Sequence, residues 1–307
     1  MAHLKIYRHS GRLGTFGLPL GLLGGLLVAL AGAFAYQRFL TWVPYLYVTF
    51  LGMLGFGAAI GLTVGIAMRA GKTRNLVLAA TIGALCGLIG DIASFQFDYE
   101  YRLVELAEAI SEEEGRTMSA EELRSDLPLL DFLVLRADIG YTLGRDGGLP
   151  IRGILVYLIW LIELVCIVGL AAHFARRRIR DPFCEQCQDW MLNQVVGVAE
   201  PIDEGTVKSA VELGDLDALL RPEEGPAFLP KKIVYSIYHC ITCDRANYLT
   251  LTLHWQEVRA KREAEEKTET LASQVIVTPE QVAILEQHLD AWQARERDGG
   301  GGAASAE

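Results

Sequence analysis

Residues 153–187 read GILVYLIWLIELVCIVGLAAHFARRRIRDPFCEQC, and this stretch carries three signals in succession. Its first part, 153–173, has one charged residue, Glu163, and as a helix is long enough to cross a hydrocarbon core of about 30 Å. The arginine cluster at 176–180 follows, as expected at the cytosolic end of a membrane span. A Cys-x-x-Cys pair then opens a polar region. The stretch therefore predicts the boundary between a membrane domain, 1–175, and a soluble domain.

Three earlier segments have the same apolar character. Residues 13–37 and 39–68 contain no charged residue, and 75–97 contains only Asp91. The chain is 51% hydrophobic with a mean hydropathy of +0.25, and nearly all of this excess precedes the arginine cluster. We therefore predict an α-helical membrane bundle of about four transmembrane helices, followed by a small α+β cytosolic domain. Cleavage of a signal peptide at Ala33-Phe34-Ala35 is the alternative for the first segment, but the apolar run is longer than signal peptides use.

Basic residues beside these segments set the predicted orientation. They precede the first segment, separate the second from the third and follow the fourth, whereas 96–150 is acidic. By the positive-inside rule, both termini face the cytosol and 96–150 forms an external loop. We expect the protein in a plasma membrane or a bacterial-type inner membrane. Besides the arginine cluster, the basic residues concerned are Lys5, Arg8, Arg12, Arg69, Lys72 and Arg74.

Glycines recur at four-residue spacing in the second and third segments. The residues are Gly57, Gly61, Gly65, Gly83 and Gly87. Because this spacing places them on one helix face, they let neighbouring backbones approach closely. We expect packing within one bundle, with a homo-oligomeric interface as the alternative. A helix that shifts or lines a pore would suit the same pattern.

Two acids lie within the predicted spans. Glu163 is near the middle of its span, where an ionised carboxylate is costly, so it faces the bundle or water, or is protonated. Tyr45, Tyr47 and Thr49 are possible partners. Glu163 either handles protons or cations or makes a helix–helix hydrogen bond, and the sequence favours neither. We expect Asp91 nearer the outer interface, where an acid costs little.

The remaining strong motif is a pair of Cys-x-x-Cys turns, Cys184 with Cys187 and Cys240 with Cys243. Two such turns supply the four thiolates of a tetrahedral site that has no open coordination position, so we predict a structural zinc ion. An iron site or a thiol–disulfide pair is the alternative. The region 176–256 resembles a zinc ribbon, although its insert, 188–239, is much longer than a simple ribbon has. The membrane domain resembles no family.

Several elements are predicted around these motifs. Outside, Ser119 and Glu122 form a capping box, and the apolar stretch 127–135 lies along the interface or on the bundle. In the soluble domain we predict a helix within the insert at 207–220 and strands at 233–239 and 248–255, with the second cysteine pair in the turn between the strands. Charged C-terminal helices should fill 257–298: a solvated one over 256–270 and one capped by Thr278 that runs to Trp292. A disordered tail, 299–307, ends the chain.

These features bound the function. A net charge of −10 argues against nucleic acid as a partner. No nucleophile–base pair, phosphate loop or catalytic metal triad is visible, so we do not expect an enzyme. The first hypothesis is a membrane-anchored interaction or regulatory protein that presents its zinc domain to a cytosolic protein partner. The alternative is a small oligomeric transporter or channel, or a subunit of one, that uses Glu163.

Overall fold

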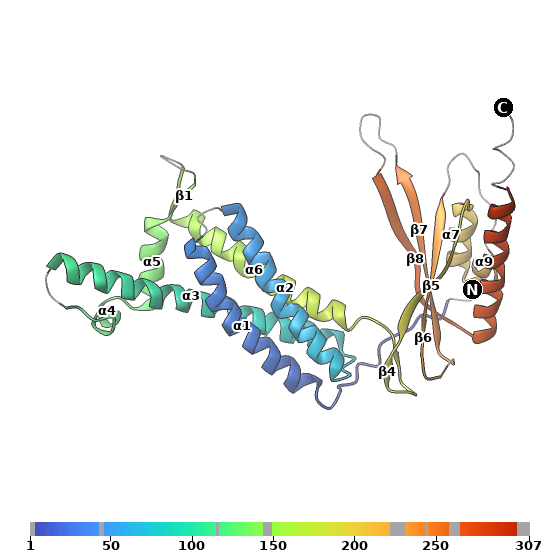
Figure 1. Cartoon of the computed structure of the whole chain (residues 1–307), viewed down its shortest axis with the longest axis horizontal. Helices are drawn as coiled ribbons and strands as arrows, with labels where there is room; N and C mark the ends of the chain where they lie inside the picture. Colours follow the sequence, from blue (N-terminus) through green and yellow to red (C-terminus); the bar gives the residue numbers. More distant parts are fainter. Residues whose placement is uncertain are drawn as a thin grey trace. The chain divides into compact units, whose positions relative to one another are not determined.

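The computed structural model describes residues 4–42, 46–114, 117–143, 149–221, 231–243, 245–257 and 265–299 (Figure 1). It divides into two compact units. The first, Ser10–Arg180, is the helical unit. The second, Met1–His9 with Asp181–Glu307, is the cysteine domain.

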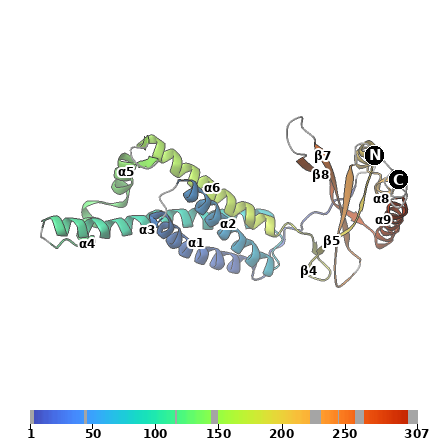
Figure 2. The same cartoon turned by 45° about the horizontal axis from the view of Figure 1, so that its top comes forward.

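Four long helices form the helical unit (Figure 2). They are α1 Gly17–Trp42, α2 Leu46–Ala70, α3 Leu76–Glu114 and α6 Ile154–Arg178. Each is long and apolar enough to cross a membrane, as the four apolar segments predict.

Five glycines bring α6 close to α2 and α3. A Cβ on Gly61 would lie 2.4 Å from the carbonyl oxygen of Ala171, and one on Gly83 would lie 2.5 Å from the same oxygen. Larger side chains at these positions would therefore force the helices apart. The other glycines of the pattern, Gly57, Gly65 and Gly87, also meet α6. The structure thus places all five against one helix of the same bundle.

Residues 96–150, expected as an external loop, are largely ordered structure. The helix α3 continues to Glu114, and α4 Ala120–Asp126, α5 Leu129–Ile139 and a hairpin of β1 Tyr141–Leu143 and β2 Leu149–Ile151 follow. The predicted capping box of Ser119 and Glu122 is present. Buried side chains at four-residue spacing on α3, among them Tyr99 and Leu103, pack against α5 and extend the helix beyond its apolar segment.

The cysteine domain contains a four-stranded antiparallel sheet in the order β5-β6-β7-β8. Its strands are β5 Leu192–Ala199, β6 Lys232–His239, β7 Asn247–Glu257 and β8 Glu265–Val277. The helices α7 Glu204–Leu213, α8 Leu216–Leu220 and α9 Pro279–Gly299 cover one face of the sheet (Figure 1). Ile233, Tyr235 and Ile237 alternate along β6 into the core beneath these helices. The helix predicted in the insert is therefore a pair, divided at Gly214, which takes a left-handed φ of 71°.

The solvated helix predicted over 256–270 is wrong. The described part of this segment is the end of β7 and the start of β8, while 258–264 lie outside the described residues. The backbone of β8 pairs with β7, and its charged side chains find partners on other elements. Lys232 Nζ lies 3.1 Å from Glu266, and Lys208 Nζ lies 3.0 Å from Glu269. These long-range contacts outweigh the weak preference that charges at i,i+4 spacing give a helix.

A short N-terminal segment joins the cysteine domain, which the sequence analysis did not anticipate. Ile6 bridges to Val275 of β8, the backbone N–H of Tyr7 donates to Gln274 O at 2.9 Å, and that of Ile276 donates to Lys5 O at 2.8 Å. Residues 5–7 thus belong to the same folded unit as the region after the fourth long helix. Of the predicted disordered tail, 299–307, residues 300–307 lie outside the described residues.

Candidate metal centre and buried polar cluster

The two cysteine pairs come from different turns of the cysteine domain. Cys184 and Cys187 belong to a hairpin of β3 Phe183–Cys184 and β4 Asp189–Trp190. Cys240 and Cys243 lie in the turn between β6 and β7. The antiparallel register of β5 with β6, in which Leu192 faces His239, brings the turns together. The long insert therefore leaves and returns at the same end of the sheet, so its length does not separate the pairs.

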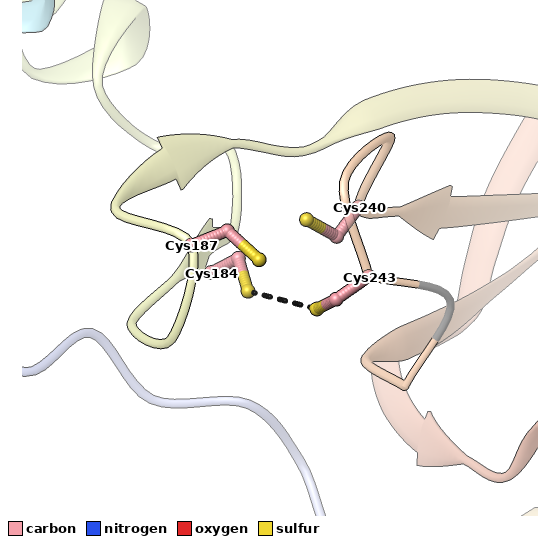
Figure 3. A group of neighbouring side chains, drawn as sticks. All are labelled: Cys184, Cys187, Cys240 and Cys243. Carbon is pink, nitrogen blue, oxygen red and sulfur yellow. Dashed lines mark hydrogen bonds between the residues drawn. The ribbon is translucent and has the colours of Figure 1, made fainter.

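The four sulfurs point toward one another (Figure 3). All four Sγ atoms lie within 4.8 Å of one another, and those of Cys184 and Cys243 are 3.6 Å apart. A tetrahedral zinc site with Zn–S bonds of about 2.3 Å has sulfurs roughly 3.8 Å apart. No disulfide joins these cysteines. The arrangement could therefore hold a metal ion with little movement of the side chains.

The surroundings of the sulfurs are apolar but contain backbone donors. Cys184 and Cys240 are buried with Met191, and Tyr248 packs on the same cluster. Burial raises the pKa of the Cys184 thiol, and hydrogen bonding to Cys243 raises that of Cys187. Burial acts in the same direction at Cys240, but the backbone N–H groups of Thr242 and Cys243 outweigh it and lower its pKa to about 7. Such donors favour the thiolate, which is the form that binds a metal.

Gln188, the residue after the first cysteine pair, has a backbone conformation in which glycine is usually found. Gln188 has a φ of 55°, in the left-handed region that favours glycine. Its side-chain Nε2 donates to the carbonyl oxygen of Glu185 at 2.6 Å, which holds the turn closed. The equivalent position after the second pair, Asp244, lies outside the described residues.

A second polar group lies inside the helical unit. The hydroxyl of Tyr36 on α1 donates to Glu163 Oε1 on α6 at 2.7 Å. The ring of Tyr36 stacks on Phe56 of α2, with ring centroids 5.5 Å apart. Glu163 is therefore bonded to α1, whereas the partners suggested from sequence lie in or just before α2. Of those, Tyr45 and the side chain of Tyr47 lie outside the described residues.

Asp91 belongs to the same interior. Its side chain is only 4% exposed, and its carboxyl group interacts electrostatically with that of Glu163. Its Oδ1 has no hydrogen-bond partner within the described part of the chain. The neighbouring helices enclose this side chain, which the sequence analysis expected near the outer interface of a membrane. Its depth in the bilayer stays a prediction.

Two features of these sites had little sequence signal. Tyr36 is one aromatic residue in an apolar span, and only its position opposite Glu163 distinguishes it. The ring of Tyr7 packs at a tilt against that of Tyr248 beside the cysteines, with ring centroids 4.8 Å apart, although Tyr7 lies far from them in the sequence. No protein-family model, curated protein or solved structure matches this chain.

Proposed function

We propose that the four cysteines hold one structural zinc ion in a zinc-ribbon-like domain. The convergence of four Sγ atoms within 4.8 Å supports this, because four thiolates fill a tetrahedral site and leave no position for a substrate. The metal would stabilise the end of the sheet at which β3, β4, β6 and β7 meet. Iron is the alternative ion for the same ligands.

Metal analysis of the purified chain tests this proposal. We expect about one zinc per chain, lost in Cys243→Ser because a serine hydroxyl is not ionised at neutral pH. Cys166→Ser, at a cysteine outside the cluster, is the matched control and should keep its zinc. Equal zinc in Cys243→Ser and wild type would refute the site, and bound iron would change the identity of the metal.

We further propose that the protein is a membrane-anchored interaction protein, with both termini in the cytosol. The edge strand β5 supports this role. Near the cysteine turns its residues are exposed, including the apolar Leu192 (51%) and Val195 (58%), while Ile241 in the adjacent turn is 66% exposed. An open strand edge with apolar side chains is suited to pairing with an extended segment of a partner protein.

The test is co-purification of the full-length chain in mild detergent, with bound proteins identified by mass spectrometry. A stoichiometric partner should be lost when Leu192 and Val195 are both replaced by lysine, because charge on an edge strand opposes strand addition. Leu213→Lys introduces the same charge at an exposed leucine of α7 and should retain the partner. A partner kept by the double variant would place the docking surface elsewhere.

A second candidate function follows from the helical unit. A partly buried Tyr36–Glu163 hydrogen bond, with the enclosed Asp91 in the same interior, favours a small oligomeric transporter or channel for protons or cations. In proteoliposomes, Glu163→Gln should abolish flux, whereas Glu108→Gln, at an exposed acid further along α3, should not. Wild-type vesicles that carry no flux would leave Glu163 with a packing role and favour the interaction protein.

A further inference from the structure

A groove lies between α1 and α3 at the end of their apolar segments. Its volume is about 350 Å³, within the range of small-molecule sites. Both helices line it, with aromatic, aliphatic and charged side chains. The residues that matter here are Phe34, Arg38, Phe97, Asp98, Glu100 and Tyr101.

The position of the groove along the helices matches a membrane surface. Arg38 lies 21 residues after Gly17, the start of α1, which is about 32 Å at 1.5 Å per residue. Phe97 lies 21 residues after Leu76, the start of α3, at a similar height. A hydrocarbon core is about 30 Å thick. If these helices span a bilayer, the groove lies at the level of the lipid headgroups.

Arg38 supplies positive charge to this groove. Its guanidinium carbon lies 4.7 Å from the ring centroid of Tyr101 and 5.5 Å from that of Phe34. Within the described part of the chain it forms no ion pair. Its planar donors therefore remain able to bind an anion, and a phosphate matches their geometry.

The two acids of the groove form ion pairs with arginines other than Arg38. Asp98 lies 3.6 Å from Arg102 and 3.5 Å from Arg136, and Glu100 pairs with Arg124. They do not compete for Arg38. Within the described part of the chain, Arg38 is thus a cation of the groove that is available to an anionic group.

The remaining walls are apolar and continue into the span. The rings of Phe34 and Phe97 meet edge to face, with centroids 5.7 Å apart. Towards the middle of α1, exposed apolar side chains follow on the same helix face, including Leu30 and Leu27. A ligand that combines an anionic head with apolar chains fits both parts.

We propose that this groove binds a glycerophospholipid, with the phosphate diester on the Arg38 guanidinium and the acyl chains along α1. The site would order one lipid at the non-cytosolic surface in the predicted orientation. It is independent of the metal centre and of the partner proposed for β5.

Thermal unfolding and native mass spectrometry of the detergent-purified chain test the proposal with three probes. Short-chain phosphatidylglycerol should raise the Tm and remain bound in the gas phase. Inorganic phosphate offers the anion without chains, and short-chain diacylglycerol offers the chains without the anion, so neither should reproduce the effect. An equal Tm shift with phosphate alone would reduce the groove to a simple anion site, and an equal shift with diacylglycerol would exclude a role for Arg38.

Variants locate the binding. Arg38→Gln should weaken phosphatidylglycerol binding about tenfold or more, because charge-assisted hydrogen bonds to the phosphate are lost. Arg38→Lys keeps the positive charge but loses the planar guanidinium that can donate two hydrogen bonds to one phosphate, and should give an intermediate affinity. Arg152→Gln removes an exposed arginine outside the groove and should bind as wild type does. Unchanged affinity in both Arg38 variants would overturn the proposal.

Discussion

At the scale of single residues, the candidate metal centre depends on the backbone conformation of its turns as well as on the cysteine sulfurs. Gln188 occupies a left-handed conformation that costs an ordinary L-residue about 1 kcal/mol. It directly follows Cys187, so the cost is incurred at the turn that positions two ligands. Its side-chain hydrogen bond to Glu185 offsets part of that cost.

Substitution of Gln188 should therefore depend strongly on the residue introduced. We expect Gln188→Val to be less stable than Gln188→Gly by about 1 kcal/mol or more, because a β-branched residue is disfavoured at positive φ. Gln186→Val makes the same change in the same turn at a residue without positive φ, and should have a smaller effect. Denaturant unfolding of the zinc-loaded chain measures the difference. Equal stability of the Val and Gly variants would contradict the assigned conformation.

At the scale of elements, small residues control how α2, α3 and α6 pack. Gly61 and Gly83 approach the same carbonyl oxygen, that of Ala171, from two different helices. The helix α6 is therefore held in the angle between α2 and α3 by close contact of backbones. The same contact sets the rotation of α6 about its axis, so that Glu163 faces α1.

A matched pair of glycines on α2 tests this packing. Gly61→Ala should lower the stability of the helical unit by about 1–3 kcal/mol, because its Cβ would overlap the backbone of α6. A Cβ on Gly55 would meet no atom within 4 Å, so Gly55→Ala should be neutral or slightly stabilising. Thermal unfolding in detergent compares the two. If Gly61→Ala is as stable as Gly55→Ala, the close approach is wrong.

At the scale of the whole molecule, a segment that precedes the first long helix pairs with a strand that follows the last one. The backbone hydrogen bonds of Lys5 and Tyr7 with β8 place the N-terminal segment and the C-terminal domain on one side of any membrane that the helices cross. The basic flanks predict that this side is the cytosol.

Accessibility labelling in intact cells tests that orientation. A cysteine introduced at the exposed Glu121 of α4 should react with a membrane-impermeant thiol reagent, because α4 is predicted to lie outside. A cysteine at the exposed Leu213 of α7 should react only after the cells are opened. Labelling of Leu213→Cys in intact cells would reverse the orientation.

Because each unit has its own buried core, removal of metal should affect them differently. We expect a strong chelator to unfold the cysteine domain, since its ligands join both turns at one end of the sheet. The helical unit should keep its far-UV circular dichroism and yield a protease-resistant fragment near Ser10–Arg180. Loss of helical signal together with the domain would show that the units are coupled.

Sequence alone was sufficient wherever the signal is local. Long apolar runs predict the four helices because a span must be continuous, and the capping box of Ser119 and Glu122 operates within four residues. The two Cys-x-x-Cys pairs likewise predict a shared site, because each turn already positions two sulfurs. The glycine spacing predicts close helix packing for the same local reason.

Only the tertiary structure decided the features that depend on contacts between distant residues. Lys267 and its neighbours favour a helix locally, but pairing with β7 and partners on other elements make this segment β8. Glu163 accepts a hydrogen bond from Tyr36 of α1, because the packing of α6 against α2 and α3 sets which way it faces. The N-terminal segment pairs with β8 through backbone groups, which every sequence has. Backbone hydrogen bonds and helix packing carry little residue-specific signal, so these outcomes follow from the assembled fold.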